Sequence, residues 1–298
     1  MFLSHRVTHP RLLDASIETH AAVHTRYRVH VVRNRRLVAE DGLFLRTFDR
    51  KGYVGRPILT VLLAGAARIR AYGTERWLGP GDVSIVESKG VIEMRQEGAE
   101  YRSLVVEWEP GFFGDEPPKG FQTGRVSELE RAHLDALALE LTQPELDATG
   151  GARAIASALR RLRAAGLPFA APEAEDLIEP VPEPALRLSA TLDVLLSDLS
   201  ANPMAVDLDR ALGVSSRHLT RLVAEFHRRY GYNAESWRDA LCRRRITVGA
   251  ALMSVPEATT DIVSRLLGYS SPTAFCRAVA EAQLPSPGRI GAAIEALR

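Results

Sequence analysis

Apolar residues in the first third of the chain fall in short runs that glycine and proline separate. Five such runs cover residues 57–65, 67–73, 77–88, 90–98 and 101–108. Short apolar or alternating runs bounded by turn residues are typical of β-strands. Because no helical pattern lies between them, they predict an antiparallel sheet that closes as a sandwich or a barrel. Residues 1–40 alternate poorly and predict no definite element.

The pattern changes to a helical period after Pro117-Pro118. Residues 126–141 and 151–166 each place leucine, isoleucine or alanine along one side of a predicted helix. Those side chains are Leu129, Ala132, Leu134, Leu137 and Leu141 in the first helix, and Ile155, Leu159 and Leu162 in the second. Further helices are predicted over residues 186–200, 206–212, 215–230, 234–253, 259–267 and 270–282.

These patterns divide the chain into four parts. Residues 1–120 form a predicted barrel, and residues 121–167 form a helical segment that packs on it or makes a dimer interface. Residues 168–184 contain five prolines and several acidic residues. That composition is typical of an exposed linker, where proteases cut first. Residues 185–298 are predicted to be all-helical, so the chain as a whole belongs to the α+β class.

One helical unit occurs twice in the C-terminal part. The segment LGVSS at 212–216 returns as LGYSS at 267–271, which is 55 residues later. Arg221 returns as Arg277, 56 residues later, so the second copy has one extra residue near its turn. A short helix, a glycine turn and a second helix make a helix-turn-helix. In DNA-binding proteins the second helix of this unit enters the major groove.

The second helix of each unit separates into an apolar and a polar side. Helical spacing turns Leu219, Leu222, Val223, Phe226 and Tyr230 inward in one unit, and Phe275, Ala278, Val279 and Ala282 in the other. The outward side carries arginines, whose planar guanidinium matches guanine O6 and N7. A plain solvated helix face is the alternative, and the duplication favours DNA contact. The candidate DNA-binding residues are Ser216, Arg217, Thr220, Arg221, Arg228, Ser271, Thr273, Cys276 and Arg277.

Composition and charge change this picture little. The net charge of the 298 residues is +1, and residues 185–298, with 14 arginines against 11 acidic residues, account for +3. The charge therefore neither indicates nor excludes a nucleic-acid partner. Cys242 and Cys276 cannot form a disulfide framework, which fits a reducing cytoplasm. No signal peptide and no apolar run of about 18 residues is present, so no contact with a membrane is expected.

Residues 185–298 resemble the DNA-binding domain of the AraC/XylS family of bacterial transcription regulators. The matching residues are LxxxLGVSxRHLTRL at 208–222, Gly231 with Trp237, Arg245-Ile246, DIxxxxLGYSSxxxFxRA at 261–278, and Ser286-Pro287. The resemblance implies two helix-turn-helix units joined by a long helix, with a structural role for Arg245. It implies base-reading positions at Arg217, Thr220 and Arg221, and at Thr273, Cys276 and Arg277.

The sequence departs from the family pattern at several places. Val223 stands where the family has phenylalanine, Asp209 where it has a small residue, and Leu284 and Ile290 replace the glycine and the aromatic residue near the terminal SP. About one extra helical turn precedes Gly231, and another lies near residues 242–245. We therefore expect the two helix-turn-helix units to be tilted or imperfectly formed. Arg243 and Arg244 fit a phosphate clamp and a solvated helix face equally well.

The N-terminal part resembles the cupin-like sensor barrels that precede this DNA-binding domain, on the turn GPGDV at 79–83. Cupin enzymes bind a metal through histidines, whereas residues 66–73 read AARIRAYG, so no metal site is expected. His20 and His24 could share a helix face, but surface histidines are the simpler interpretation. A small acidic effector is the candidate ligand, or else the barrel is packed with its charges outward. The candidate effector residues are Arg68, Arg70, Tyr72, Glu93 and Arg95.

The resemblance implies a cytoplasmic transcription regulator, typically an activator, that is not an enzyme and needs no cofactor. Its expected partners are double-stranded DNA, RNA polymerase, a small-molecule effector and a second copy of the chain. Two alternatives stay open: a degenerate regulator that binds protein partners or DNA without sequence preference, and a cupin-type enzyme with a helical appendage.

Overall fold

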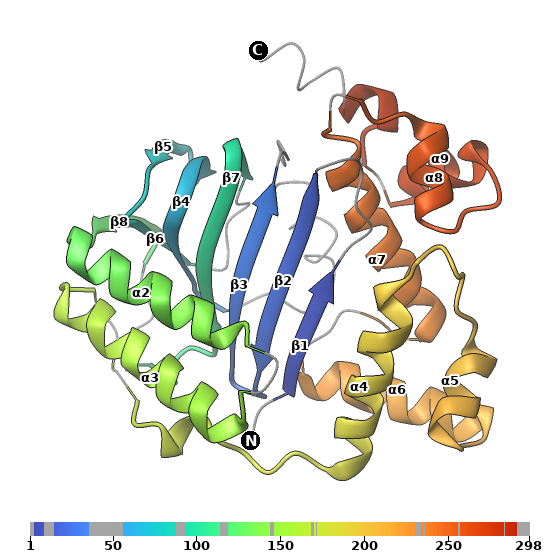
Figure 1. Cartoon of the computed structure of the whole chain (residues 1–298), viewed down its shortest axis with the longest axis horizontal. Coiled ribbons are helices and arrows are strands. Elements are labelled where there is room, and N and C mark those ends of the chain that lie inside the picture. Colours follow the sequence, from blue (N-terminus) through green and yellow to red (C-terminus); the bar gives the residue numbers. More distant parts are fainter. Residues whose placement is uncertain are drawn as a thin grey trace.

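The computed structural model combines one antiparallel sheet with two sets of helices (Figure 1). It describes residues 3–8, 15–35, 56–87, 93–113, 119–143, 146–167, 170, 172–230, 234, 236–255, 257–282 and 284–290. The strands are β1 (Leu3–Thr8), β2 (Ser16–Val23), β3 (Tyr27–Arg35), β4 (Ile58–Ala71), β5 (Thr74–Leu78), β6 (Asp82–Val86), β7 (Glu93–Trp108) and β8 (Phe121–Arg125). The α+β class is confirmed.

The sheet is open, whereas the sequence predicted a closed barrel. Its strands run in the order β1-β2-β3-β7-β4-β6-β8, with β5 paired to β4, and no ladder joins β1 to β8 among the described residues. β4 and β7 each merge two segments that the sequence had predicted as separate strands. Their pairing shifts register near Leu62, Ala64 and Ala66. Gly65 lies there at φ +84°, where a Cβ atom would come within 2.3 Å of the Glu100 carbonyl.

Strands β1 to β3 are a second departure from the prediction. The sequence predicted no element before residue 41, yet β2 and β3 pair over eight residues and β3 pairs with β7 over nine. The alternation in β3 is incomplete, because Val31 and Val32 are adjacent and residues 33–35 are all polar. Two of its polar side chains, Arg28 and Asn34, are buried together with Val29 and Val31. In β3, therefore, the polar or apolar character of a residue does not tell whether its side chain is buried.

Helices α2 (Glu128–Leu141) and α3 (Ala148–Ala164) cover one face of the sheet (Figure 1). Both predicted helices are confirmed. Ser127 caps α2 by accepting a hydrogen bond from the Glu130 amide, and Asp147 caps α3 in the same way. The covered face is apolar and packs in one cluster with the two helices. Its sheet residues include Val29, Val31, Leu59, Val61, Leu63, Val83, Ile85, Leu104 and Val106.

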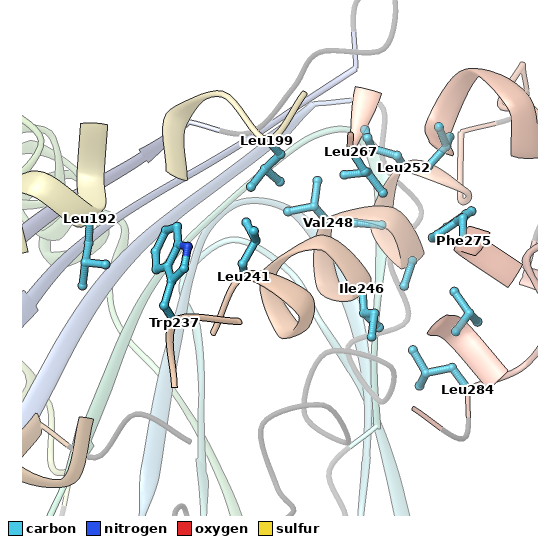
Figure 2. Close-up of a cluster of buried hydrophobic side chains, with 14 of the residues drawn as sticks. Leu192, Leu199, Trp237, Leu241, Ile246, Val248, Leu252, Leu267, Phe275 and Leu284 are labelled. Carbon is cyan, nitrogen blue, oxygen red and sulfur yellow. The ribbon is translucent and has the colours of Figure 1, made fainter. Parts of the chain in front are cut away.

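The C-terminal part is all-helical, as predicted. Its helices are α4 (Glu183–Ser197), α5 (Ala205–Leu212), α6 (Ser216–Tyr230), α7 (Trp237–Leu252), α8 (Thr260–Leu266) and α9 (Pro272–Glu281). Helix α7 runs between the other helices, and its side chains occupy the centre of their core (Figure 2). Trp237 and Leu241 lie towards Leu192 and Leu199, while Val248 and Leu252 lie towards Leu267 and Phe275 (Figure 2).

The proline-rich segment is packed against the sheet rather than wholly solvated. It holds a short 3-10 helix, Glu175–Leu177, and Leu177 is fully buried. The Tyr27 hydroxyl donates to the Leu177 carbonyl at 2.8 Å, and the Thr25 hydroxyl donates to Glu179 at 2.8 Å. The N-terminal residues Ala15 and Val23 belong to the core of the C-terminal helices. The two halves of the chain are thus in direct contact.

Candidate nucleic-acid interface

Helices α5 and α6 form the first helix-turn-helix unit. Gly213 ends α5 at φ +65°, the left-handed region that glycine adopts without strain. Helix α6 then buries the predicted apolar side, namely Leu219, Val223, Phe226 and Tyr230, with Leu222 half-buried. His227 is also buried, and its Nδ1 lies 2.8 Å from the Ala234 carbonyl. The predicted outward face of α6 is thereby left to solvent.

Helices α8 and α9 form the second unit in the same manner. Gly268 ends the first helix at φ +71°, and Ser271 caps α9 by accepting from the Ala274 amide at 3.1 Å. Phe275 and Val279 are buried. In the first unit the matching cap is Ser215, whose hydroxyl accepts from the His218 amide at 3.4 Å. Ser271 therefore corresponds to Ser215, so the extra residue of the second copy lies in its turn.

The predicted base-reading side chains lie on the solvent side of both second helices. Arg217, Thr220, Arg221 and Arg228 are exposed on α6, and Thr273, Cys276 and Arg277 are exposed on α9. Arg221 and Arg277 stand six residues after the capping serines Ser215 and Ser271 respectively. The structure thus places them at equivalent positions, one and a half turns into each helix. Neither has a role in the core.

Ser216 and Ser271, which were predicted to contact DNA, make hydrogen bonds within the protein. The Ser216 hydroxyl donates to Asp209 at 2.5 Å, and the Ser271 hydroxyl is occupied by its cap. Asp209 stands where the resembling family has a small residue, and its carboxylate links α5 to the first turn of α6. Both serines therefore position the reading helices. The hydroxyl proton of Ser216 is already used within the protein.

Helix α7 holds the two units together. Trp237 Nε1 donates to the Pro203 carbonyl at 3.1 Å, just before α5 begins. The buried Arg245 donates to the Leu199 carbonyl at 3.0 Å and to Asn202 at 2.8 Å, and its guanidinium stacks over Tyr269. Arg245 thus contacts segments next to both units, and it has a structural role. Its neighbour Arg243 pairs with Asp239 at 2.9 Å on the helix surface.

Of the five candidate effector residues, the structure describes the side chains of Arg68 and Tyr72, and neither points into the core of the sheet. Ala67, Ile69 and Ala71 are buried on one side of β4, so Arg68 lies on the other side, where it pairs with Glu75 at 3.4 Å and faces the Trp77 ring. Tyr72 is exposed and donates to the Glu87 carbonyl. The side chains of Arg70, Glu93 and Arg95 lie outside the described residues.

The two histidines near the N-terminus do not share a helix face. His20 lies on β2 and His24 follows that strand, and both are buried, so the surface interpretation was wrong. His24 stacks on Tyr27 and lies 3.8 Å from Glu179. Within the described part of the chain, no three His, Cys, Asp or Glu side chains gather as a metal would require. No described helix is both long and apolar enough to cross a membrane.

Comparisons with known proteins give a structural likeness only. No family model matches the sequence, and no curated protein matches it. Among solved structures, ToxT from Vibrio cholerae aligns over 89% of this chain and 98% of its own, with 10% identity and a TM-score of 0.36. Protein Ylba from E. coli aligns over 35% of this chain and 40% of its own, with 12% identity and a TM-score of 0.26.

The similar structures also include an AraC-like transcriptional activator. This protein, CuxR, aligns over 78% of the present chain and 86% of its own, with 10% identity and a TM-score of 0.36. Sequence identities and TM-scores this low do not identify a function. The argument for a function therefore rests on the two helix-turn-helix units themselves.

Proposed function

We propose that this protein is a sequence-specific DNA-binding regulator of transcription that reads DNA with α6 and α9 and catalyses no reaction. The observation that carries the proposal is the matched pair of reading helices. Each buries its apolar side in a shared core and presents an arginine to solvent at an equivalent position, Arg221 and Arg277. A surface that merely needed solvation would not require the same turn, cap and arginine twice.

Helix α7 supports the use of both units on one DNA. Its 16 residues span about 24 Å, and Trp237 and Arg245 bind it to the segment that leads into α5. Units held this firmly favour a target with two short recognition elements at a set spacing, because neither unit can shift independently.

Control by a small molecule and by a second copy are further parts of the proposal. The sheet contacts the end of α6, since Arg28 on β3 donates a hydrogen bond to the Tyr230 carbonyl. A ligand that alters the sheet can therefore act on a reading helix.

Leu129 and Leu139 leave apolar surface exposed on α2, where a second copy can pack. Contact with RNA polymerase would give activation.

Occupancy of the full-length protein along its own chromosome tests the proposal. Sequence-specific reading predicts a few sharp peaks that share one motif with two elements. Purified protein should then bind such a fragment more tightly than random DNA at every salt concentration. Equal and steeply salt-dependent binding to both DNAs would instead show a sequence-blind interaction with the phosphate backbone.

A further inference from the structure

The two helix-turn-helix units differ at one position of their first helix. The repeat of 55 residues aligns Asp209 on α5 with Ser264 on α8. Ser264 is fully buried, and its hydroxyl donates to the Asp261 carbonyl of its own helix at 2.9 Å. Asp209 is only half-buried. The first unit therefore has a partly accessible carboxylate where the second unit has a small, enclosed hydroxyl.

The carboxylate of Asp209 lies at the start of the reading helix α6. Its Oδ2 accepts from the hydroxyl of Ser216, the first residue of α6, at 2.5 Å. Its Oδ1 is buried and has no hydrogen-bond partner among the described residues. Thr220 also uses its hydroxyl within the helix, donating to the Ser216 carbonyl at 3.0 Å. Both hydroxyl donors of the reading face are thus engaged, which leaves that face its arginines.

No arginine offsets the charge of Asp209 in the part of the chain that the structure describes. Three other aspartates of the C-terminal helices pair with an arginine three or four positions further along the same helix, namely Asp207 with Arg210, Asp239 with Arg243 and Asp261 with Arg265. The positions that would serve Asp209 in this way hold Leu212 and Gly213. Its negative charge therefore acts at the junction of α5 and α6.

This junction is the part of a helix-turn-helix unit that meets the DNA backbone. The first helix crosses the phosphates, and the second enters the major groove with its N-terminal residues. Serine hydroxyls and helix N-termini are common phosphate donors. At α6, however, Asp209 already holds the hydroxyl of Ser216, and its carboxylate repels an approaching phosphate. The geometry therefore disfavours a phosphate contact at the first turn of α6.

We propose that Asp209 is a specificity-determining residue, whose carboxylate keeps a DNA phosphate away from the first turn of α6. The proposal rests on the proposed function, because it requires that α6 reads DNA. On random DNA the protein is free to shift to the best phosphate contacts, and Asp209 removes one of them. On the target, base contacts of Arg217 and Arg221 hold α6 in one register, so the same loss matters less. Asp209 thus widens the difference in affinity between target and random DNA.

Asp209→Asn tests the proposal, because the amide oxygen still accepts from Ser216 while the charge is removed. We expect the full-length variant to bind random double-stranded DNA about 5-fold more tightly than the parent at about 0.1 M salt. The dependence of its affinity on salt should steepen by about one phosphate contact. Affinity for the DNA fragment selected by chromosomal occupancy, the selected DNA, should rise less. Titrations of fluorescent DNA at several salt concentrations measure these changes.

Two control variants separate the charge of Asp209 from other causes. Ser216→Ala breaks the hydrogen bond but keeps the carboxylate, and Glu140→Gln removes an exposed negative charge from α2. Both should bind random DNA within about 2-fold of the parent. A gain in Glu140→Gln equal to that in Asp209→Asn would show a general effect of net charge, and an equal gain in Ser216→Ala would show a loosened start of α6. Either result contradicts the proposal.

A second substitution, Asp209→Ser, copies Ser264 of the other unit and should act in the same direction as Asp209→Asn. Thermal melts show which variants are folded, and Asp209→Ser carries the test if Asp209→Asn is not. Unchanged binding to random DNA, or an equal gain on random and selected DNA, would overturn the proposal and leave the proposed function intact. A parent that binds both DNAs equally would contradict the proposed function itself, and with it the role of Asp209. The preference of the parent, measured first, tells the two failures apart.

Discussion

At the scale of single residues, α6 and α9 separate sharply into a side that holds the fold and a side that faces solvent. Leu219 and Phe275 are buried at equivalent positions, while Arg221 and Arg277 are exposed two residues later in each helix. Because surface substitutions away from caps and cores usually change stability by less than about 0.5 kcal/mol, the arginines can be removed without unfolding either unit.

Arg221→Ala should weaken binding to the selected DNA by about 1–3 kcal/mol and relax the preference at one base pair. Arg217 and Thr220 accompany Arg221 on the exposed face, whereas Arg277 has only Thr273 and Cys276 for polar company, so Arg277→Ala should cost less. Binding curves on selected and random DNA, with thermal melts, measure both effects.

The matched control for the arginines is Arg153→Ala, which removes an exposed arginine from α3 of the sheet domain. It should leave DNA binding unchanged. If Arg221→Ala lost equal affinity on selected and random DNA, Arg221 would be a phosphate contact. A large drop in Tm would show instead that the side chain is structural.

His227 makes stability depend on pH. Burial lowers its pKa, and the Ala234 carbonyl and Asp239 offset that only in part. The unfolded chain binds this proton near pH 6.5, while the folded chain binds it only at lower pH. Acid therefore favours unfolding, and stability that is present above about pH 6.5 is lost as the pH falls through the folded pKa.

We expect Tm to fall between pH 7.5 and pH 5, and His227→Gln to reduce that fall. His218→Gln, on the exposed side of the same helix, should keep the pH dependence of the parent. Thermal melts over this pH range measure the effect. An identical pH dependence in His227→Gln and the parent would exclude His227 as the source.

At the scale of elements, the two helix-turn-helix turns are alike in backbone and different in surroundings. Gly213 and Gly268 both adopt left-handed conformations. Nothing lies within 4 Å of the position a Cβ would take at Gly213. At Gly268 it would come within 2.4 Å of the Leu199 carbonyl and 2.7 Å of an Arg245 nitrogen. Only the second turn is pressed against α7 and its partners.

Gly213→Ala should therefore cost about 1–2 kcal/mol, the strain of a left-handed alanine. Gly268→Ala should cost roughly 2–5 kcal/mol, because overpacking adds to the same strain. Urea unfolding of the two variants gives both values. Equal losses would mean that the contact of Gly268 with Leu199 and Arg245 does not constrain the second unit.

At the scale of the whole molecule, the proline-rich segment joins the two halves through specific contacts. The Thr25 amide and hydroxyl both donate to the Glu179 carboxylate, at 3.0 and 2.8 Å. Leu177 is buried beside them. A segment held in this way opens only by local unfolding, so its sensitivity to proteases reports on these contacts.

Glu179→Ala should speed cleavage within residues 172–182 by roughly 5-fold or more, since losing about 1 kcal/mol of local stability has that effect. Limited subtilisin digestion of the full chain, followed by mass spectrometry, locates and times the cuts. Glu173→Ala, which removes only an exposed ion pair with Arg160, is the control. Equal rates in both variants would show that Glu179 does not hold the segment.

The amino-acid sequence by itself determined the C-terminal half of the molecule. The helices, the duplicated turn and the exposed positions of Arg221 and Arg277 all follow from local rules: helical spacing, glycine at a left-handed position and serine at a cap. These rules act over a few residues. A single sequence therefore contains all the information that they need, and the structure confirms the expected helices.

Only the tertiary structure decided the course of the sheet and the junction of the two halves. Burial of Arg28, His24 and Glu107 contradicts the ordinary preference of charged side chains for water. It depends on partners far away in the sequence, such as the Tyr230 carbonyl for Arg28 and Glu179 for the turn after β2. The register shifts in β4 likewise belong to its pairing with β7. Long-range contacts of this kind leave no periodic pattern in the chain.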